Sequence, residues 1–290
     1  MRGTMRAVGV AVALVGVLNV TGAREDEAYD LRGPAPAKGQ VVVSKTVFKI
    51  KNADLVMKVA GQKVEAKQTM TVTETEEVKV LAVDGRQSTK VQTKMVKEQI
   101  ETVTTLGGQD MPDTKAGDLE GEVVISERTG PAKWKHTLVD TKANDKQKKE
   151  LDKRTGPESQ DDLYPEGKTK VGHAWTVDAA ALQRVFGGSI TDLKGKLKMK
   201  FVRVEDVDGE ACAVIESAGK VTGVAKEDEG TLDVELDLKG TTWRSIKTGV
   251  DVKDKTTGRM KMSGKIEQDG AKVDLVLDGP ITIDGTAKQK

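Results

Sequence analysis

Few residues of this 290-residue chain could carry metal or thiol chemistry. It has two histidines, His136 and His173, and one cysteine, Cys212. A zinc site takes three or four ligands from cysteine, histidine and carboxylate at close spacing. Because the histidines lie far apart in the chain, such a site would need both of them and a carboxylate such as Asp140, and no motif supports that arrangement. We therefore predict neither a metal site nor a cofactor.

Motifs for other kinds of catalysis are also missing from the sequence. There is no G-x-S-x-G sequence around a nucleophilic serine, and no glycine-rich loop followed by Lys-Ser or Lys-Thr for a phosphate. The acidic runs at residues 158–162 and 227–229 do not fit an EF-hand loop and are typical of solvated loops. A pair of catalytic carboxylates, as in a glycosidase, stays an alternative, although only eight aromatic residues are available to contact a sugar. We predict no catalytic residues.

The single thiol has apolar neighbours in the sequence EACAVIE. A reactive cysteine needs an electropositive setting and a basic partner, whereas a free cysteine in apolar surroundings is usually packed and inert. We therefore interpret Cys212 as a core residue. Since one thiol cannot form an intramolecular disulfide, the chain must fold on its core alone.

Uncommon residues gather in the stretch LYPEGKTKVGHAWTVD, residues 163–178. Its alternation places Val171, His173, Trp175 and Val177 on one face of a short strand. In an aromatic-poor chain, Trp175 is interpreted as an anchor that packs the second half of the chain against the first. His173, at the edge of that face, is kept as a possible ligand contact.

Methionines supply a second set of candidate ligand-binding residues. A flexible, polarizable methionine lining would suit an adaptable apolar ligand, and the alternative is that methionine fills gaps in a core with few aromatic residues. The predicted ligand-binding residues are His173, Trp175, Met70, Met95, Met199 and Met262.

The N-terminus predicts export. Arg2 and Arg6 precede an apolar run, and Thr21-Gly22-Ala23 provides small residues for cleavage after Ala23. An uncleaved anchor is the alternative, but the run is short for a membrane span. We therefore expect residues 1–23 to be a signal peptide, residues 24–39 a linker, and the mature protein to be soluble and periplasmic or secreted.

The balance of basic and acidic side chains gives no indication of a polyanion-binding role. Loss of Arg2 and Arg6 leaves 45 basic and 46 acidic side chains, so the mature surface is balanced and no nucleic acid partner is expected. The most basic segment is KGKLKMKFVR, residues 194–203. Its alternation indicates the solvent face of a half-buried strand at least as readily as a phosphate-binding track.

Most of the sequence has the period of two that is typical of antiparallel strands. In residues 64–82 the apolar side chains fall on even positions, and residues 232–239 alternate leucine or valine with charged residues. Three Asp-Gly pairs predict hairpins. The predicted cross-strand pairs are Val78–Val91, Glu74–Met95, Val204–Ala213, Val202–Ile215, Ile266–Val273, Gly264–Leu275 and Met262–Leu277.

Two short helices are predicted in the middle of the chain. The first covers residues 143–154, with Asn144 as its N-cap. The second covers residues 178–186, with Asp178 as its N-cap. We therefore predict a mainly β fold, with a long, curved antiparallel sheet or a partly closed β-barrel. Residues 40–290 should form one domain, whose halves at about 40–139 and 163–290 are joined by a helical connection at 140–162.

The order of these features resembles a family of exported bacterial proteins of unknown function. The resemblance rests on the signal, the long first hairpin ending V-x-x-V-D-G, the charged helical segment, Pro165, K-V-G-x-x-W at residues 170–175 and the glycine-punctuated tail with T-G-R-M-K-M. His173 stands where that pattern has an acidic residue. The overall form also resembles periplasmic lipoprotein and lipid carriers, which implies a curved sheet around an apolar ligand.

The prediction for function is a non-enzymatic binding protein of the cell envelope that holds an apolar ligand, a lipid or a lipoprotein, in a curved sheet. The alternatives are a structural or interaction protein of the envelope, whose partner would be another envelope protein, and an uncharacterised hydrolase, which would require His173. An apolar cavity of ~300 Å³ or more would favour the first, and an exposed apolar patch would favour the second.

Overall fold

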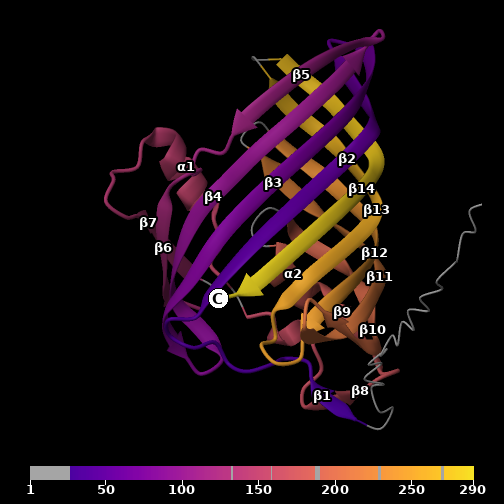
Figure 1. Cartoon of the computed structure of the whole chain (residues 1–290). Coiled ribbons are helices and arrows are strands. Elements are labelled where there is room, and N and C mark those ends of the chain that lie inside the picture. The colour runs from indigo at the N-terminus through magenta and orange to yellow at the C-terminus, as the bar shows by residue number, and fades with distance from the viewer. Residues whose placement is uncertain (1–26, 132, 158, 187–189, 228–229, 269–270) are drawn as a thin grey trace, which may run out of the picture.

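The fold is a single, strongly curved antiparallel sheet (Figure 1). The computed structural model describes residues 27–131, 133–157, 159–186, 190–227, 230–268 and 271–290. Strands make up 73% of the described residues, and the twelve-stranded sheet does not close. The prediction of a mainly β fold with two short helices in the middle is confirmed. The predicted cleavage point at Ala23 lies outside the described residues.

The strands follow one another along the chain as a meander. The first half contains β1 (Ala28–Asp30), β2 (Val41–Val59), β3 (Gln62–Asp84), β4 (Gln87–Leu106), β5 (Gln109–Ala116), β6 (Val123–Gly130) and β7 (Lys133–Leu138). The second half contains β8 (Lys168–Lys170), β9 (Ala174–Asp178), β10 (Ile190–Val207), β11 (Glu210–Glu227), β12 (Gly230–Ser245), β13 (Asp251–Gln268) and β14 (Ala271–Gln289).

Pairing of β14 with β2 joins the two halves into one sheet. The order is β7-β6-β4-β3-β2-β14-β13-β12-β11-β10-β9, with β5 paired to β4 as a separate branch. β1 and β8 form a small two-stranded sheet, so the segment interpreted as a linker begins with a paired strand. In Figure 1, β2, β3, β4 and β14 form the near wall of the sheet, and strands of the second half pass behind them.

The inner face of the sheet is an apolar core. In β12, Leu232, Val234, Leu236 and Leu238 are buried, whereas the charged residues between them are exposed. These leucines share one cluster with Ile50, Leu55, Phe201 and Ile215 from β2, β10 and β11. Burial of every inward residue from Leu232 to Leu238 shows that the sheet's own side chains fill this part of the concave side.

Glycines and bulges bend the long strands. A Cβ at Gly258 or Gly264 would collide with a carbonyl oxygen of β12, and Leu238 and Leu232 lie opposite these two glycines. The register also shifts in β2 between Ile50 and Ala53. Long strands must coil, and glycine kinks and bulges are the devices that allow strong curvature.

The two helices lie apart: α1 (Asp145–Lys153) lies beside β7, and α2 (Ala179–Phe186) packs against β9 and β10 (Figure 1). α1 starts with a capping box in which Asn144 and Gln147 bond each other's backbone, and Leu151 is its buried anchor. α2 is capped by Asp178, whose carboxylate accepts from the backbone N–H groups of Ala180 and Ala181 at 3.1 Å. The helix starts predicted at Asn144 and Asp178 are confirmed.

Hairpin register was predicted correctly in part. The pairs Ile266–Val273, Gly264–Leu275, Met262–Leu277 and Val204–Ala213 are confirmed. In the first hairpin, Val91 lies opposite Val80, and Met95 lies opposite Glu76, so the predicted pairs Val78–Val91 and Glu74–Met95 are wrong. The turn residues are Gly85 and Arg86 rather than Asp84 and Gly85, and bulges displace the register further. Ile215 likewise faces Phe201 rather than Val202, because of a bulge in β10.

Candidate functional site

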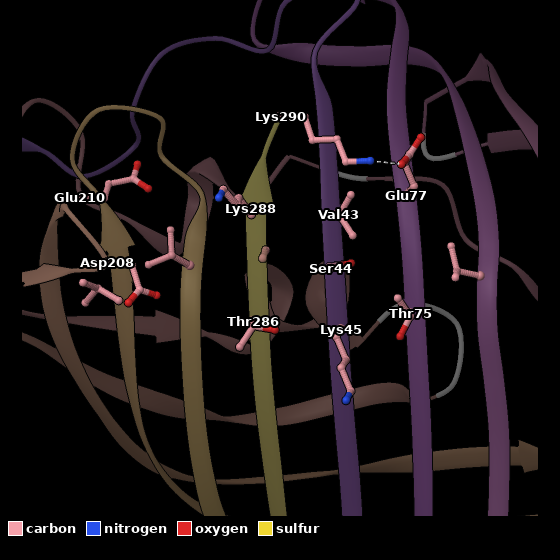
Figure 2. Close-up of a pocket in the computed structure, with 14 residues that line it drawn as sticks. Val43, Ser44, Lys45, Thr75, Glu77, Asp208, Glu210, Thr286, Lys288 and Lys290 are labelled. Carbon is pink, nitrogen blue, oxygen red and sulfur yellow. Dashed lines mark hydrogen bonds and ion pairs between the residues drawn. The ribbon is translucent and has the colours of Figure 1, made fainter.

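A groove of about 680 Å³ lies on the sheet near the C-terminus (Figure 2). Its walls come from β2, β3, β4, β13 and β14 and from the turn between β10 and β11. Strand alternation places Val43 and Lys45 on the face opposite Phe48 and Ile50, which pack in the core. The groove is therefore on the outer face of β2, and we call it the valine groove.

Short apolar side chains line the valine groove along much of its length. They are Val43, Val96, Val207 and Val252. Val96 is 49% exposed because it lies in a bulge of β4, beside the Thr75–Lys97 pair. Such side chains offer apolar contact area without the bulk that would fill the space.

Charged side chains of both signs surround the apolar ones. The Lys290 ammonium donates to the Glu77 carboxylate at 2.5 Å, and this hydrogen bond holds the pKa of Glu77 below its usual range. Lys45 and Lys288 lie on neighbouring strands in the same groove (Figure 2). At the other end, Glu210 accepts a hydrogen bond from the Ser245 hydroxyl. The groove thus combines an apolar lining with fixed charges.

Beside the valine groove, Trp243 lies on the outer face of the second half of the sheet. Its indole N–H donates to Glu205 at 3.3 Å, and the Lys253 ammonium lies 4.7 Å from its ring centroid. Val214 pairs directly with Trp243 and is fully buried, although it points away from the main core. Trp243 therefore forms a rigid, partly exposed ridge on the outer face.

A buried network holds the end of β12 and the start of β13, where Val252 lies. Arg244 donates to Asp251 at 2.7 Å, and its guanidinium lies 3.9 Å from the ring centroid of Tyr164. It also donates to the carbonyl oxygens of Leu31 at 2.5 Å and Arg32 at 3.3 Å. Burial raises the pKa of Tyr164, so its hydroxyl stays protonated and donates to Asp251. We call these residues the Arg244 clamp.

Sequence reasoning missed the Arg244 clamp and the valine groove. The clamp joins residues more than 200 positions apart, and no motif marks them. The groove depends on which strands lie side by side, which the hairpin turns alone do not specify for β2 and β14.

The predicted ligand-binding residues His173 and Trp175 lie away from the valine groove, at the β9 edge of the sheet. The rings of His173 and Trp175 stack with centroids 6.0 Å apart, and the Trp175 indole donates to the Leu163 carbonyl at 2.8 Å. Trp175 packs against the main core, and His173 is exposed. A ligand contact by this pair stays a prediction.

The predicted methionines do not all share one surface. Met199 is buried in the main core, and Met70 and Met262 pack against it. Met95 belongs to a second, smaller cluster with Leu119, Val124 and Leu151. Their role in ligand binding stays a prediction, but none of the four is among the residues that line the valine groove.

The remaining candidate residues are placed as structural side chains. Cys212 is fully buried, and burial together with Glu210, Asp206 and Glu205 raises the pKa of its thiol to about 11. Ser126 lies 2.8 Å from His136 Nδ1, but Ser126 is only 3% exposed, so a substrate could not reach its hydroxyl.

Within the described residues, no three histidine, cysteine, aspartate or glutamate side chains converge as metal ligands. None of the helices in these residues is long and apolar enough to cross a membrane.

Comparisons with known proteins return structural neighbours alone. No family model and no curated protein matches the sequence. An outer membrane channel from Pseudomonas putida F1 aligns with 88% of this chain and 97% of its own, at 10% identity and a TM-score of 0.25. A DUF1329 family protein from Desulfovibrio piger aligns with 86% of this chain and 84% of its own, at 8% identity and a TM-score of 0.12. TM-scores this low assign neither a fold family nor a function.

Proposed function

We propose that the protein is a non-enzymatic binding protein of the bacterial cell envelope, which takes an apolar chain into the valine groove. The observation that carries the proposal is a groove of about 680 Å³ that combines partly exposed valines with fixed charges. Ligand sites typically measure about 300–1,000 Å³ and pair apolar walls with a few polar groups. The export signal expected in residues 1–23 supports the envelope as the place of action.

The outer face is a better candidate than the concave face. Leu232, Val234, Leu236 and Leu238 are already covered by the protein's own side chains, so a ligand on that side would have to displace them. In the valine groove, by contrast, Val96 is exposed, and Val43, Val207 and Val252 are only half-buried. Burial of each ligand methylene there would contribute about 0.8 kcal/mol.

The test combines native mass spectrometry with a targeted variant. We expect an apolar chain to co-purify with the wild-type protein, and a fluorescent fatty-acid probe to bind to the delipidated protein. Val96→Asn and Val252→Asn together should weaken binding of the probe at least tenfold. Val276→Asn is the matched control, because Val276 lies on the same face of β14 but outside the groove.

Equal probe affinities for the wild-type protein and the Val96→Asn, Val252→Asn double variant would exclude the groove as the binding site. Thermal unfolding of all variants shows whether each is folded. Failure of the wild-type protein to bind any apolar chain would exclude the proposed function as a whole.

One observation favours a structural or interaction protein as a second candidate. Ile100, Leu106 and Met111 are 36%, 41% and 49% exposed, and register places them on one face of the β4–β5 hairpin. Exposed apolar residues that gather in one place are typical of protein contacts. Sedimentation velocity of the wild-type protein and a Leu106→Ser, Met111→Ser variant tests this candidate, and a monomer at all concentrations would count against self-association.

A further inference from the structure

A second hollow, of about 660 Å³, lies on the outer face of β10 to β13. Lysines supply most of its charged lining: Lys198 and Lys200 from β10, Lys239 from β12 and Lys255 from β13. Glu216 is the one acidic residue among those that line it. We call this feature the lysine hollow.

Strand register brings the four lysines together. Lys198 lies opposite Ala218, which in turn lies opposite Lys239. Lys200 and Lys255 occupy the next row, on either side of Glu216 and Thr241. Directly paired residues are about 5 Å apart, and residues two positions apart on one strand are separated by about 7 Å. Lys198 and Lys239 are therefore two strand spacings, about 10 Å, apart, and Lys200 and Lys255 are three, about 14 Å, apart. An anion between the two rows lies within reach of the long side chains that flank it.

Within the part of the chain that the structure describes, the side chains of Lys198, Lys200, Lys239 and Lys255 make no hydrogen bond or ion pair. Other lysines on this face are paired, as Lys220 is with Asp237 and Lys261 with Glu235. Four like charges around a floor of small residues such as Ala218 create a local positive potential that an anion would neutralise.

The lysine hollow adjoins the valine groove. Val252 of the groove and Lys255 of the hollow are three residues apart on β13, about 10 Å along the strand. Trp243 and Lys253 form the ridge between the two sites. An apolar site beside a cationic one matches a ligand with an apolar chain and an anionic head.

We infer that the lysine hollow binds the phosphate headgroup of an anionic lipid whose acyl part lies in the valine groove. The inference rests on the proposed function, because it assigns the head of the same ligand. A phosphate group suits the site because it accepts hydrogen bonds from several ammonium groups at once.

Three probes separate the head from the tail. Isothermal titration calorimetry at low salt compares dioctanoyl phosphatidylglycerol, dioctanoylglycerol and pyrophosphate with the purified protein. We expect phosphatidylglycerol to bind about tenfold more tightly than dioctanoylglycerol, which has the same tails without phosphate. The Lys239→Gln, Lys255→Gln variant should lose this tenfold difference, and higher salt should reduce it.

The matched control is Lys261→Gln, Lys265→Gln, which removes two charges from the same face outside the hollow. It should keep the preference for phosphatidylglycerol. Equal affinities for the two lipids, together with no effect of Lys239→Gln, Lys255→Gln, would overturn the headgroup inference and leave the proposed function standing. Binding of pyrophosphate alone would identify a free phosphate anion as the ligand, and it would overturn both proposals, as would failure of all three probes.

Discussion

Replacement of Arg244 by methionine should destabilise the fold far more than any surface change. The Arg244 side chain is 4% exposed, and its guanidinium bonds the Asp251 carboxylate and the carbonyl oxygens of Leu31 and Arg32. Methionine fills much of the same volume but satisfies none of these acceptors. Removing one partner of a buried pair leaves the other charge uncompensated, which costs about 3–5 kcal/mol.

The matched control is Arg259→Met. Arg259 also pairs with an aspartate, Asp278, at 2.7 Å, but its side chain is 61% exposed. Exposed pairs contribute about 0–1 kcal/mol, so the two arginine-to-methionine changes should differ by at least ~2 kcal/mol. The comparison keeps the substitution and the aspartate partner constant and changes the burial and the number of acceptors that lose their donor.

Urea unfolding followed by circular dichroism measures both effects as shifts in the midpoint. An m-value equal to that of the wild-type protein would show that the difference lies in stability. A loss for Arg244→Met no larger than that for Arg259→Met would refute the assignment of the Arg244 clamp as a main structural contact. Tyr164→Phe should cost about 1 kcal/mol, because it removes the hydroxyl bond to Asp251 and keeps the ring under the guanidinium.

The remaining predictions concern pH, thiol reactivity and strand curvature. Burial and the facing Glu74 raise the pKa of Glu98, so the folded state holds this proton to higher pH than the unfolded state, and stability is lost as the pH rises through the folded-state pKa. Glu98→Gln should therefore raise stability at pH 7 by up to ~1 kcal/mol and have less effect near pH 4, as urea midpoints at the two values would show. Cys212 should not react with N-ethylmaleimide in the native protein and should react fully in urea, which mass spectrometry detects; rapid native labelling would contradict its burial. Gly258→Ala should lower the melting temperature, because its Cβ would meet the Asp237 carbonyl, and an unchanged melting temperature would show that the strand can relax.

The sequence predicted the strands and one face of each, but it predicted the distant contacts poorly. The pairs Ile266–Val273 and Met262–Leu277 followed from one tight turn between two regular strands. In the first hairpin, bulges near Val80 changed the register, and a bulge leaves no clear sign in a regular alternation. The clamp between Leu31 and Arg244 depends on chain-wide folding and could not be inferred from local patterns.

The lysines of KGKLKMKFVR show how far alternation can lead toward a site. Their spacing assigned Lys198 and Lys200 to the solvent face, and the structure places both on that face, exposed. Alternation says nothing about what stands beside them. Had β11 supplied acidic residues at both facing positions, the lysines would be paired and the hollow neutral. Instead Ala218 faces Lys198, and β12 places Lys239 on the other side of Ala218. The positive charge of the hollow therefore depends on the register of four neighbouring strands. For this reason the sequence of β10 alone could not decide between a solvent-exposed face and a phosphate-binding site.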